Sequence, residues 1–263
     1  MAYVSTAQKM EMAERLRTNM RKFFITGAGI DSCLREAPPK ALEYMDGFFQ
    51  EEVRRRDEHK RAGMIRNAGF PSVKDIGDYD LSGLRMPSSM GKEAMLSLDF
   101  IRDRQSLIMY GVCGSGKTML AVCLGMMACN AGFRVRFATL SQLAVRLKAA
   151  AADGRLENCL NSYRSLDLLV IDEWGYCQLD KESAGYVFQV IADSYERKSL
   201  IVTTNLPFSE WGKIVADEQL AAAIIDRIVH YGHLIGTGDK DWRLTHSPMN
   251  RQTVTTMKGT ETK

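Results

Sequence analysis

One eight-residue segment, GVCGSGKT at Gly111–Thr118, constrains the fold of this 263-residue chain more than any other feature. It matches the pattern GxxxxGK[ST] at every fixed position. An apolar run, Leu107–Tyr110, precedes it, and a segment with helical periodicity, Lys117–Asn130, follows. Glycines let the backbone curl so that successive N–H groups point at phosphate oxygens, and the helix N-terminus adds partial positive charge. The segment therefore predicts a phosphate-binding loop between a strand and a helix.

The loop also predicts how a nucleoside triphosphate binds. Lys117 is expected to reach the β- and γ-phosphates, and the Thr118 hydroxyl is expected to bind Mg²⁺. ATP and Mg²⁺ are thus the expected ligands. A chance glycine-rich turn is the alternative, which the strand before the loop and the helix after it disfavour. The predicted nucleotide-binding residues are Gly111, Val112, Cys113, Gly114, Ser115, Gly116, Lys117, Thr118 and Met119.

Two carboxylates, Asp172 and Glu173, directly follow the apolar run Leu168–Ile171. A buried strand disfavours internal charges, so we expect the pair to emerge at the C-terminal end of the strand, where open parallel sheets bind ligands. Asp172 is expected to hold Mg²⁺, usually through a water, and Glu173 to act as the general base on the attacking water. A glutamate after the Mg²⁺ aspartate favours ATP hydrolysis over kinase-type transfer.

Apolar runs alternate with helical periods from residue 97 onward, which predicts a parallel α/β sheet flanked by helices. The expected strands are 106–110, 134–138, 168–171, 200–203 and 234–236, and the expected helices are 117–130, 141–152, 181–196 and 217–229. The predicted organisation is a helical N-terminal domain that binds DNA or a partner (1–69), an extended connector (70–92), an ATPase domain (93–245) and a polar C-terminal tail (246–263).

Two polar residues outside these motifs are further candidates for catalysis. Asn205 ends the fourth apolar run, where it could orient the attacking water or simply form a turn. Arg227 lies in the last predicted helix and could stabilise charge on the γ-phosphate of a neighbouring subunit. It could equally form a surface ion pair, for example with Asp226. From the residues alone, both alternatives stay open.

Two longer segments carry a more specific signal. LDLLVIDEWGY and YERKSLIVTTNLPFSEWGKIVADEQLAAAIIDRIVH resemble the IstB-type transposition-helper ATPases, which are similar to DnaC-type helicase loaders within the AAA+ ATPases. The resemblance extends from about Phe48 to Leu244 and includes RNAGFP at Arg66–Pro71. It implies an AAA+ P-loop NTPase whose phosphate-loop strand is central and which lacks a C-terminal helical lid.

The resemblance also assigns roles to single residues. It implies that Asn205 is the sensor residue on the strand between the phosphate loop and the acidic pair. It implies that Arg227 is an arginine finger acting in trans, and it leaves a structural role for Arg243. Lys117, Glu173, Asn205 and Arg227 are therefore the predicted catalytic residues.

The net charge of +3 permits nucleic-acid binding without demanding it. Contacts to duplex DNA are expected to be sequence-neutral, because no base-reading motif is visible. One basic run could instead be a solvated helix face with Asp57 and Glu58 as internal partners. The candidate DNA-binding residues are Arg54, Arg55, Arg56, Lys60 and Arg61 in that run, and Arg146 and Lys148, which the resemblance slightly favours.

The expected function is an ATP-dependent, DNA-binding helper that oligomerises on DNA, with ATP at subunit interfaces, and assists or targets a transposase. The alternatives are a DnaC-like replicative helicase loader and a nucleotide-gated scaffold without turnover; an intact Glu173 disfavours the scaffold. A cytoplasmic protein is expected, since no apolar run approaches the ~20 residues of a membrane span and the N-terminus lacks the pattern of a secretion signal.

Overall fold

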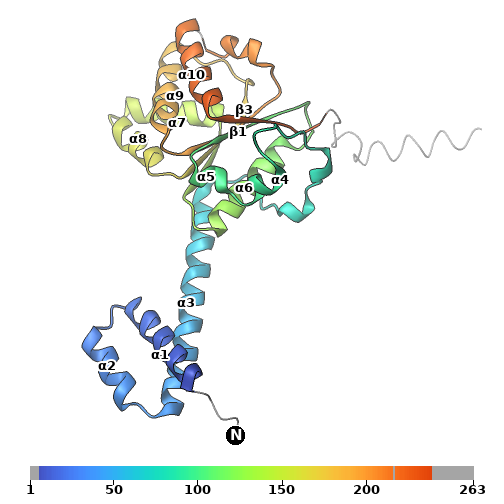
Figure 1. Ribbon diagram of the computed structural model, residues 1–263. Helices are drawn as coiled ribbons and strands as arrows, with labels where there is room; N and C mark the ends of the chain where they lie inside the picture. Colours follow the sequence, from blue (N-terminus) through green and yellow to red (C-terminus); the bar gives the residue numbers. More distant parts are fainter. Residues whose placement is uncertain (1–5, 216, 239–263) are drawn as a thin grey trace, which may run out of the picture. The chain divides into compact units, whose positions relative to one another are not determined.

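A computed structural model describes residues 6–215 and 217–238 of the chain. The chain divides into two compact units, Met1–Gly63 and Met64–Lys263, and each is described by itself (Figure 1). Three predictions lie outside the described residues: the polar tail at 246–263, the absence of a C-terminal lid, and the role of Arg243.

The first unit is helical, as the sequence indicates. Its helices are α1 (Thr6–Arg21), α2 (Gly27–Glu36) and the first part of α3 (Pro39–Ala68). Helix α3 runs over 30 residues without a break, because no proline lies inside it after the first residue. The core of the unit is small, and its fully buried apolar side chains are Leu16, Met20 and Ile30.

The second unit is built on a parallel five-stranded sheet with the order β2-β3-β4-β1-β5. This confirms the predicted α/β class. The resemblance implied that the phosphate-loop strand β1 is central, but β4 takes the middle position and β1 lies between β4 and β5. The strands are β1 (Ser106–Tyr110), β2 (Val135–Thr139), β3 (Leu168–Trp174), β4 (Ser199–Thr204) and β5 (Gly232–Gly236).

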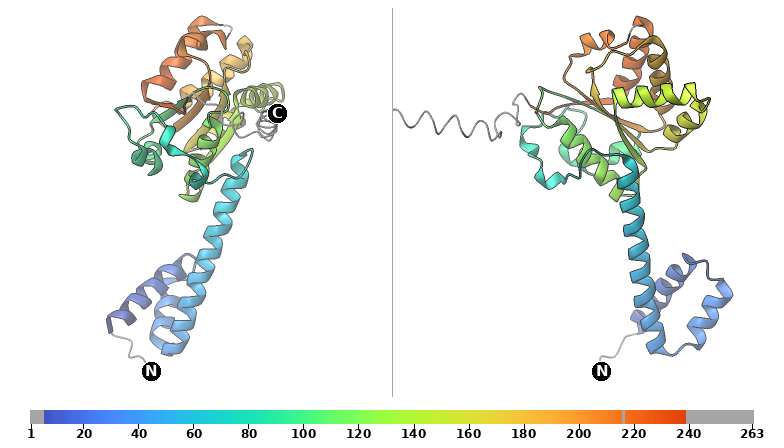
Figure 2. Two further views of the ribbon diagram at one scale, coloured as in Figure 1. Left: turned by 90° about the vertical axis from the view of Figure 1, so that its right-hand side faces the viewer. Right: turned by 180° about the vertical axis from the view of Figure 1, so that it is seen from behind.

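Helices cover both faces of the sheet because alternate strand residues point to opposite sides. Leu107 and Met109 of β1 pack with α6 (Lys117–Asn130), whereas Ile108 joins the core on the other face. Figure 2 shows the helices on the two sides of the sheet. The helices of the other face are α7 (Leu140–Ala152), α8 (Leu156–Arg164), α9 (Lys181–Ser194) and α10 (Glu218–His230). Of these, α8 was not predicted.

The segment at 70–92, expected as an extended connector, packs onto the second unit. Ile76, Tyr79 and Leu81 contact the core beneath α6. Arg85 exchanges two backbone hydrogen bonds with Gly236 of β5, at 2.9 and 3.0 Å, and so pairs with that edge strand. The segment contains η1 (Ile76–Asp78) and η2 (Leu81–Gly83), and short helices α4 (Lys92–Leu96) and α5 (Asp99–Arg102) follow it.

The remaining short element is η3 (Phe208–Lys213), which follows β4. In the part of the chain that the structure describes, no helix is long and apolar enough to cross a bilayer.

Candidate active site

The loop between β1 and α6 requires glycine at two positions. Gly111 has φ +157°, and a Cβ there would lie 2.6 Å from Thr237 Oγ1 and 2.8 Å from Ser115 Oγ. Gly116, at the N-terminus of α6, has φ +93°, and a Cβ would lie 3.0 Å from the Tyr79 ring. A larger residue would therefore collide with Thr237 and Ser115 at the first position, or with Tyr79 at the second.

Lys117 lies over this loop. Its Nζ donates hydrogen bonds to the carbonyl oxygens of Gly111 and Val112, both at 2.8 Å. These two bonds hold the ammonium against the start of the loop, and its contact with phosphate oxygens stays a prediction.

Asp172 lies at the centre of a buried hydroxyl–carboxylate cluster. The Thr118 hydroxyl donates to its two oxygens at 3.0 and 3.1 Å, and the Thr203 hydroxyl donates to Oδ1 as well. Carboxylate and hydroxyl oxygens suit Mg²⁺, so the two predicted metal residues, Thr118 and Asp172, fit that ion. The expectation that the strand excludes charge was wrong in one respect. Strand β3 continues to Trp174, and Asp172 is buried inside it because two hydroxyl donors satisfy its carboxylate.

Glu173 is exposed at the carboxyl edge of the sheet. Its φ is +59°, a left-handed value that is rare in a strand. The β3–β4 ladder is interrupted between Ile171 and Trp174, and the Glu173 N–H instead donates to Thr203 Oγ1 at 3.1 Å. Glu173 therefore stands beside the Mg²⁺ candidate Asp172 with its carboxylate accessible to water, as a general base requires.

Asn205 reaches the phosphate loop from the end of β4. Its Nδ2 donates to Cys113 Sγ at 3.9 Å, and the Tyr176 hydroxyl lies 3.0 Å from the same sulfur. The predicted loop, acidic pair and sensor residue thus come together at one edge of the sheet. Their catalytic roles stay predictions.

Residues 36–250 match the family described as IstB-like ATP binding protein. The chain belongs to this family. It is 32% identical over 210 residues to the "Insertion sequence IS5376 putative ATP-binding protein" of Geobacillus stearothermophilus, covering 80% of this chain and 84% of that protein. It is 31% identical over 218 residues to the "Insertion sequence IS21 putative ATP-binding protein" of Pseudomonas aeruginosa, covering 82% of each.

A solved structure has a similar fold. The crystal structure of the DnaI protein aligns with a TM-score of 0.51 at 16% identity, over 68% of this chain and 92% of that one. At this identity the likeness concerns the fold alone. Family and fold together make this chain a P-loop AAA+ ATPase that binds and hydrolyses ATP.

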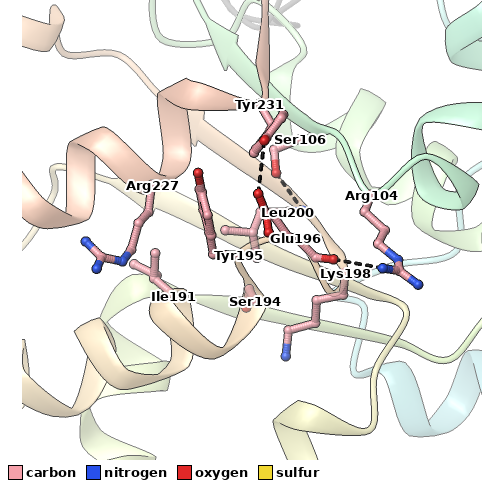
Figure 3. A pocket seen from close by; sticks show the side chains of 10 residues that line it. All are labelled: Arg104, Ser106, Ile191, Ser194, Tyr195, Glu196, Lys198, Leu200, Arg227 and Tyr231. Carbon is pink, nitrogen blue, oxygen red and sulfur yellow. Dashed lines mark hydrogen bonds between the residues drawn. The ribbon is translucent and has the colours of Figure 1, made fainter.

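Arg227 of this family member lies away from its own phosphate loop. It lines a small depression with Ser106, Lys198 and Leu200, at the amino ends of β1 and β4 (Figure 3). The loop follows the carboxyl end of β1, about 17 Å further along a five-residue strand. Opposite ends of one strand therefore separate Arg227 from the nucleotide site of the same chain.

The guanidinium of Arg227 contacts its own helix and a ring of α9. It donates to the Ala223 carbonyl at 3.0 Å, and its Cζ lies 4.9 Å from the centre of the Phe188 ring. The expected alternative of an ion pair with Asp226 is not formed, and the residues described by the structure give Arg227 no carboxylate partner.

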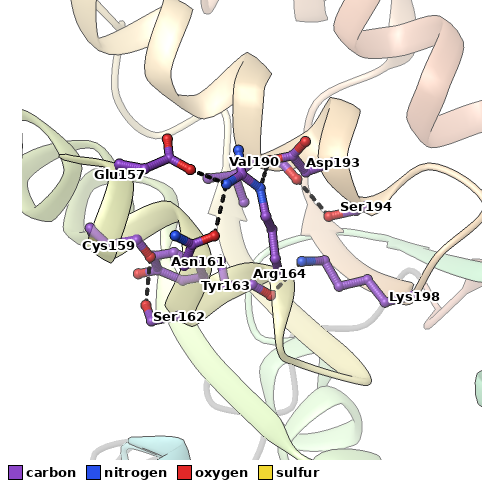
Figure 4. Close-up of polar contacts among 10 residues, drawn as sticks. All are labelled: Glu157, Cys159, Asn161, Ser162, Tyr163, Arg164, Val190, Asp193, Ser194 and Lys198. Atoms are coloured by element: carbon purple, nitrogen blue, oxygen red, sulfur yellow. Dashed lines mark hydrogen bonds and ion pairs between the residues drawn. The ribbon is translucent and has the colours of Figure 1, made fainter.

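Lys198, which lines the same depression as Arg227, is buried beside a polar cluster of α8 and α9 that the sequence did not reveal (Figure 4). The side chain is 3% exposed, and its Nζ donates to the Tyr163 carbonyl at 2.5 Å. Burial is the main cause that lowers the pKa of Lys198 to about 8; the charge of Asp193 opposes this shift, and the charge of Arg164 adds to it. Arg164 in turn bonds Asp193 at 2.7 Å, so the cluster ties α8 to α9 and to the start of β4.

The basic run on α3 is paired with glutamates one turn away. Arg54 and Arg55 bond Glu51 at 2.7 and 2.8 Å. These two hydrogen bonds lower the pKa of the Glu51 carboxyl to about 2. We predicted Asp57 and Glu58 as partners, and Glu58 does pair with Arg54, but Glu51 and Glu52 were missed. The remaining candidates on this helix, Lys60 and Arg61, are exposed.

The two DNA-binding candidates on α7 differ in whether a carboxylate already pairs with them. Lys148 pairs with Asp180 at 2.7 Å and lies 3.9 Å from Glu182. Arg146 is exposed, and its Cζ lies 5.8 Å from the centre of the Tyr163 ring. The charge of Arg146 is thus available to an external anion, whereas the charge of Lys148 is already paired with carboxylates.

Proposed function

We propose that this protein is an ATP-driven DNA-binding helper that oligomerises on duplex DNA and assists or targets a transposase. Support for a transposition role comes from the family and from relatives named as insertion-sequence ATP-binding proteins. One observation supports the proposal that copies of this chain assemble. Arg227 lies at the end of the sheet opposite its own loop, so it can act on ATP only in another copy.

A head-to-tail contact between copies would join these two ends. Both ends carry exposed apolar side chains, with Val112 and Tyr176 around the phosphate loop and Val229 and Tyr231 beside Arg227. Heterologous contacts of this kind generate rings or helical filaments. The ATP site would then be complete only at the interface, and ATP binding would favour the oligomer by mass action.

In the proposed hydrolysis, each residue acts on ATP or on the attacking water. Lys117 holds the β- and γ-phosphates, and Asn205 orients the water. Glu173 takes a proton from that water as the water oxygen attacks the γ-phosphorus. The bond between the γ-phosphorus and the oxygen that bridges it to the β-phosphate breaks, which leaves ADP and phosphate. Mg²⁺, held by Thr118 and Asp172 when bound, would neutralise phosphate charge. Arg227 of a neighbouring copy would stabilise the charge on the transferring group.

The DNA contacts that we propose are to phosphates. Lys60, Arg61 and Arg146 have no carboxylate partner among the residues that the structure describes, so they can bind phosphate without breaking an ion pair. The other candidates would first have to give up a carboxylate partner before they could bind a phosphate; they are Arg54, Arg55, Arg56 and Lys148. Repetition of these phosphate contacts on each subunit would raise the affinity for DNA by multivalency. We place this activity in the cytoplasm.

Sedimentation with ATP, ADP or a slowly hydrolysed analogue, each with and without duplex DNA, tests the proposal. ATP and the analogue should produce DNA-bound oligomers, and added salt should weaken binding steeply as counterions are released. A monomer under all six conditions would refute the mechanism. A helicase loader is the second candidate, because the IstB-type ATPases that the sequence resembles are similar to DnaC-type helicase loaders. Capture of a replicative helicase and not of the transposase would identify that function.

A further inference from the structure

The β3–β4 ladder fails at the two acidic residues, and one side chain replaces the lost pairing. Regular register holds up to Ile171 and resumes at Trp174. Between these residues the Thr203 hydroxyl accepts a hydrogen bond from the Glu173 N–H at 3.1 Å and donates one to Asp172 Oδ1. Thr203 is 2% exposed, so water does not compete for these bonds.

The direction of both hydrogen bonds is determined by chemistry. A backbone N–H can only donate, so Thr203 Oγ1 must offer a lone pair to Glu173. The single hydroxyl proton is then left for the Asp172 carboxylate. One hydroxyl therefore links the backbone of the general-base candidate to the carboxylate of the metal candidate.

The link matters because Glu173 has a disfavoured backbone. A side-chain-bearing residue at φ +59° persists only where its surroundings hold it there. The bond to Thr203 acts directly on the peptide group of Glu173. Without it, the left-handed conformation would lose a specific contact, and the carboxylate would move relative to the phosphate loop.

We propose that Thr203 is a positioning residue for ATP hydrolysis, holding Glu173 and Asp172 in the relation that the reaction needs. It does not touch the phosphate loop in its own hydrogen bonds, and Thr118 keeps an independent bond to Asp172 at 3.0 Å. Loss of the Thr203 hydroxyl should therefore impair the chemical step more than ATP binding.

Thr203→Val, which keeps the shape of the side chain and removes the hydroxyl, tests this inference. Misplacing a catalytic group by about 1 Å can cost ~10²-fold in rate, so we expect kcat to fall by about 10- to 100-fold with the affinity for an ATP analogue nearly unchanged. The Mg²⁺ concentration for half-maximal rate should rise. Thr203→Ser keeps the hydroxyl and should restore most of kcat.

Ser199→Ala is the matched control. Ser199 is buried on the same strand, and its hydroxyl donates to the Phe100 carbonyl at 2.9 Å, at the amino end of the sheet. Its loss costs a comparable hydrogen bond without touching the acidic pair, and kcat should stay near the wild-type value. Circular dichroism and thermal unfolding verify that each variant is folded.

The inference is wrong if folded Thr203→Val turns over ATP at the wild-type rate, if Thr203→Ser fails to restore it, or if Ser199→Ala loses as much activity. Should Thr203→Val not fold, Thr203→Cys retains volume with a much weaker donor and acceptor, and a wild-type rate in that variant also overturns the inference.

Discussion

Replacing Arg227 by alanine separates ATP binding from ATP turnover. The side chain contacts Ala223 and Phe188, one turn back on α10 and across on α9, and lies at the far end of β1 from the loop. Arg227→Ala should therefore bind ATP as the wild type does. Arginine fingers contribute ~10³–10⁵ in rate in well-studied nucleotide hydrolases, so turnover should fall to a small fraction of normal.

Mixing two inactive variants tests whether the arginine acts between subunits. In an equal mixture of Arg227→Ala and Lys117→Ala subunits, half of the sites have an intact loop, and half of those face a neighbour with an intact arginine. A head-to-tail assembly therefore restores about one quarter of the wild-type activity per site. An arginine acting within its own subunit would restore none.

Phosphate release measured at constant total subunit concentration, over a series of mixing ratios, provides the assay. Activity should be near zero for each variant alone and reach its maximum at the equal ratio. Co-purification of two differently tagged variants establishes that mixed oligomers form. If they form and no ratio restores activity, or if Arg227→Ala alone hydrolyses ATP at the wild-type rate, the trans arrangement is refuted.

Three further substitutions have distinct expected outcomes. Lys117→Ala should lose ATP binding, since the loop loses its mobile cation, and equilibrium binding of a labelled analogue with wild-type affinity would contradict the assignment. Glu173→Gln should bind ATP and stop hydrolysis, because the amide is a poor base; normal turnover would exclude Glu173 as the base. Lys198→Met addresses the buried ammonium, whose pKa lies at about 8 in the folded protein. The unfolded chain binds this proton more tightly, so the free energy of unfolding of the wild type should gain about 3 kcal/mol relative to Lys198→Met as pH rises from about 8 to about 10.5. Urea unfolding of both proteins at several pH values measures this difference, and a difference independent of pH would argue against a charged buried Lys198.

The sequence by itself determined the features that depend on neighbours along the chain. GVCGSGKT predicts the loop because its glycines, lysine and threonine act within eight residues of each other. The alternation of apolar runs and helical periods predicts the parallel sheet, and the position of Asp172 and Glu173 after such a run predicts the acidic edge. Periodicity also predicted the start of the helix at 181, and in the structure α9 begins at Lys181 after the Asp180 N-cap.

Tertiary structure alone decided which residues far apart in the chain meet at the site. Thr203 reaches Asp172 and Glu173 because β3 and β4 are neighbours whose ladder breaks there, and Tyr79 reaches Gly116 because the expected connector folds back onto the second unit. Strand order likewise places β4 in the middle of the sheet and Arg227 at its far end. Periodicity reports which face of an element is apolar, but not which element covers that face or in what register. A buried charge such as Asp172 is tolerated only once those long-range contacts bring hydroxyl donors to it.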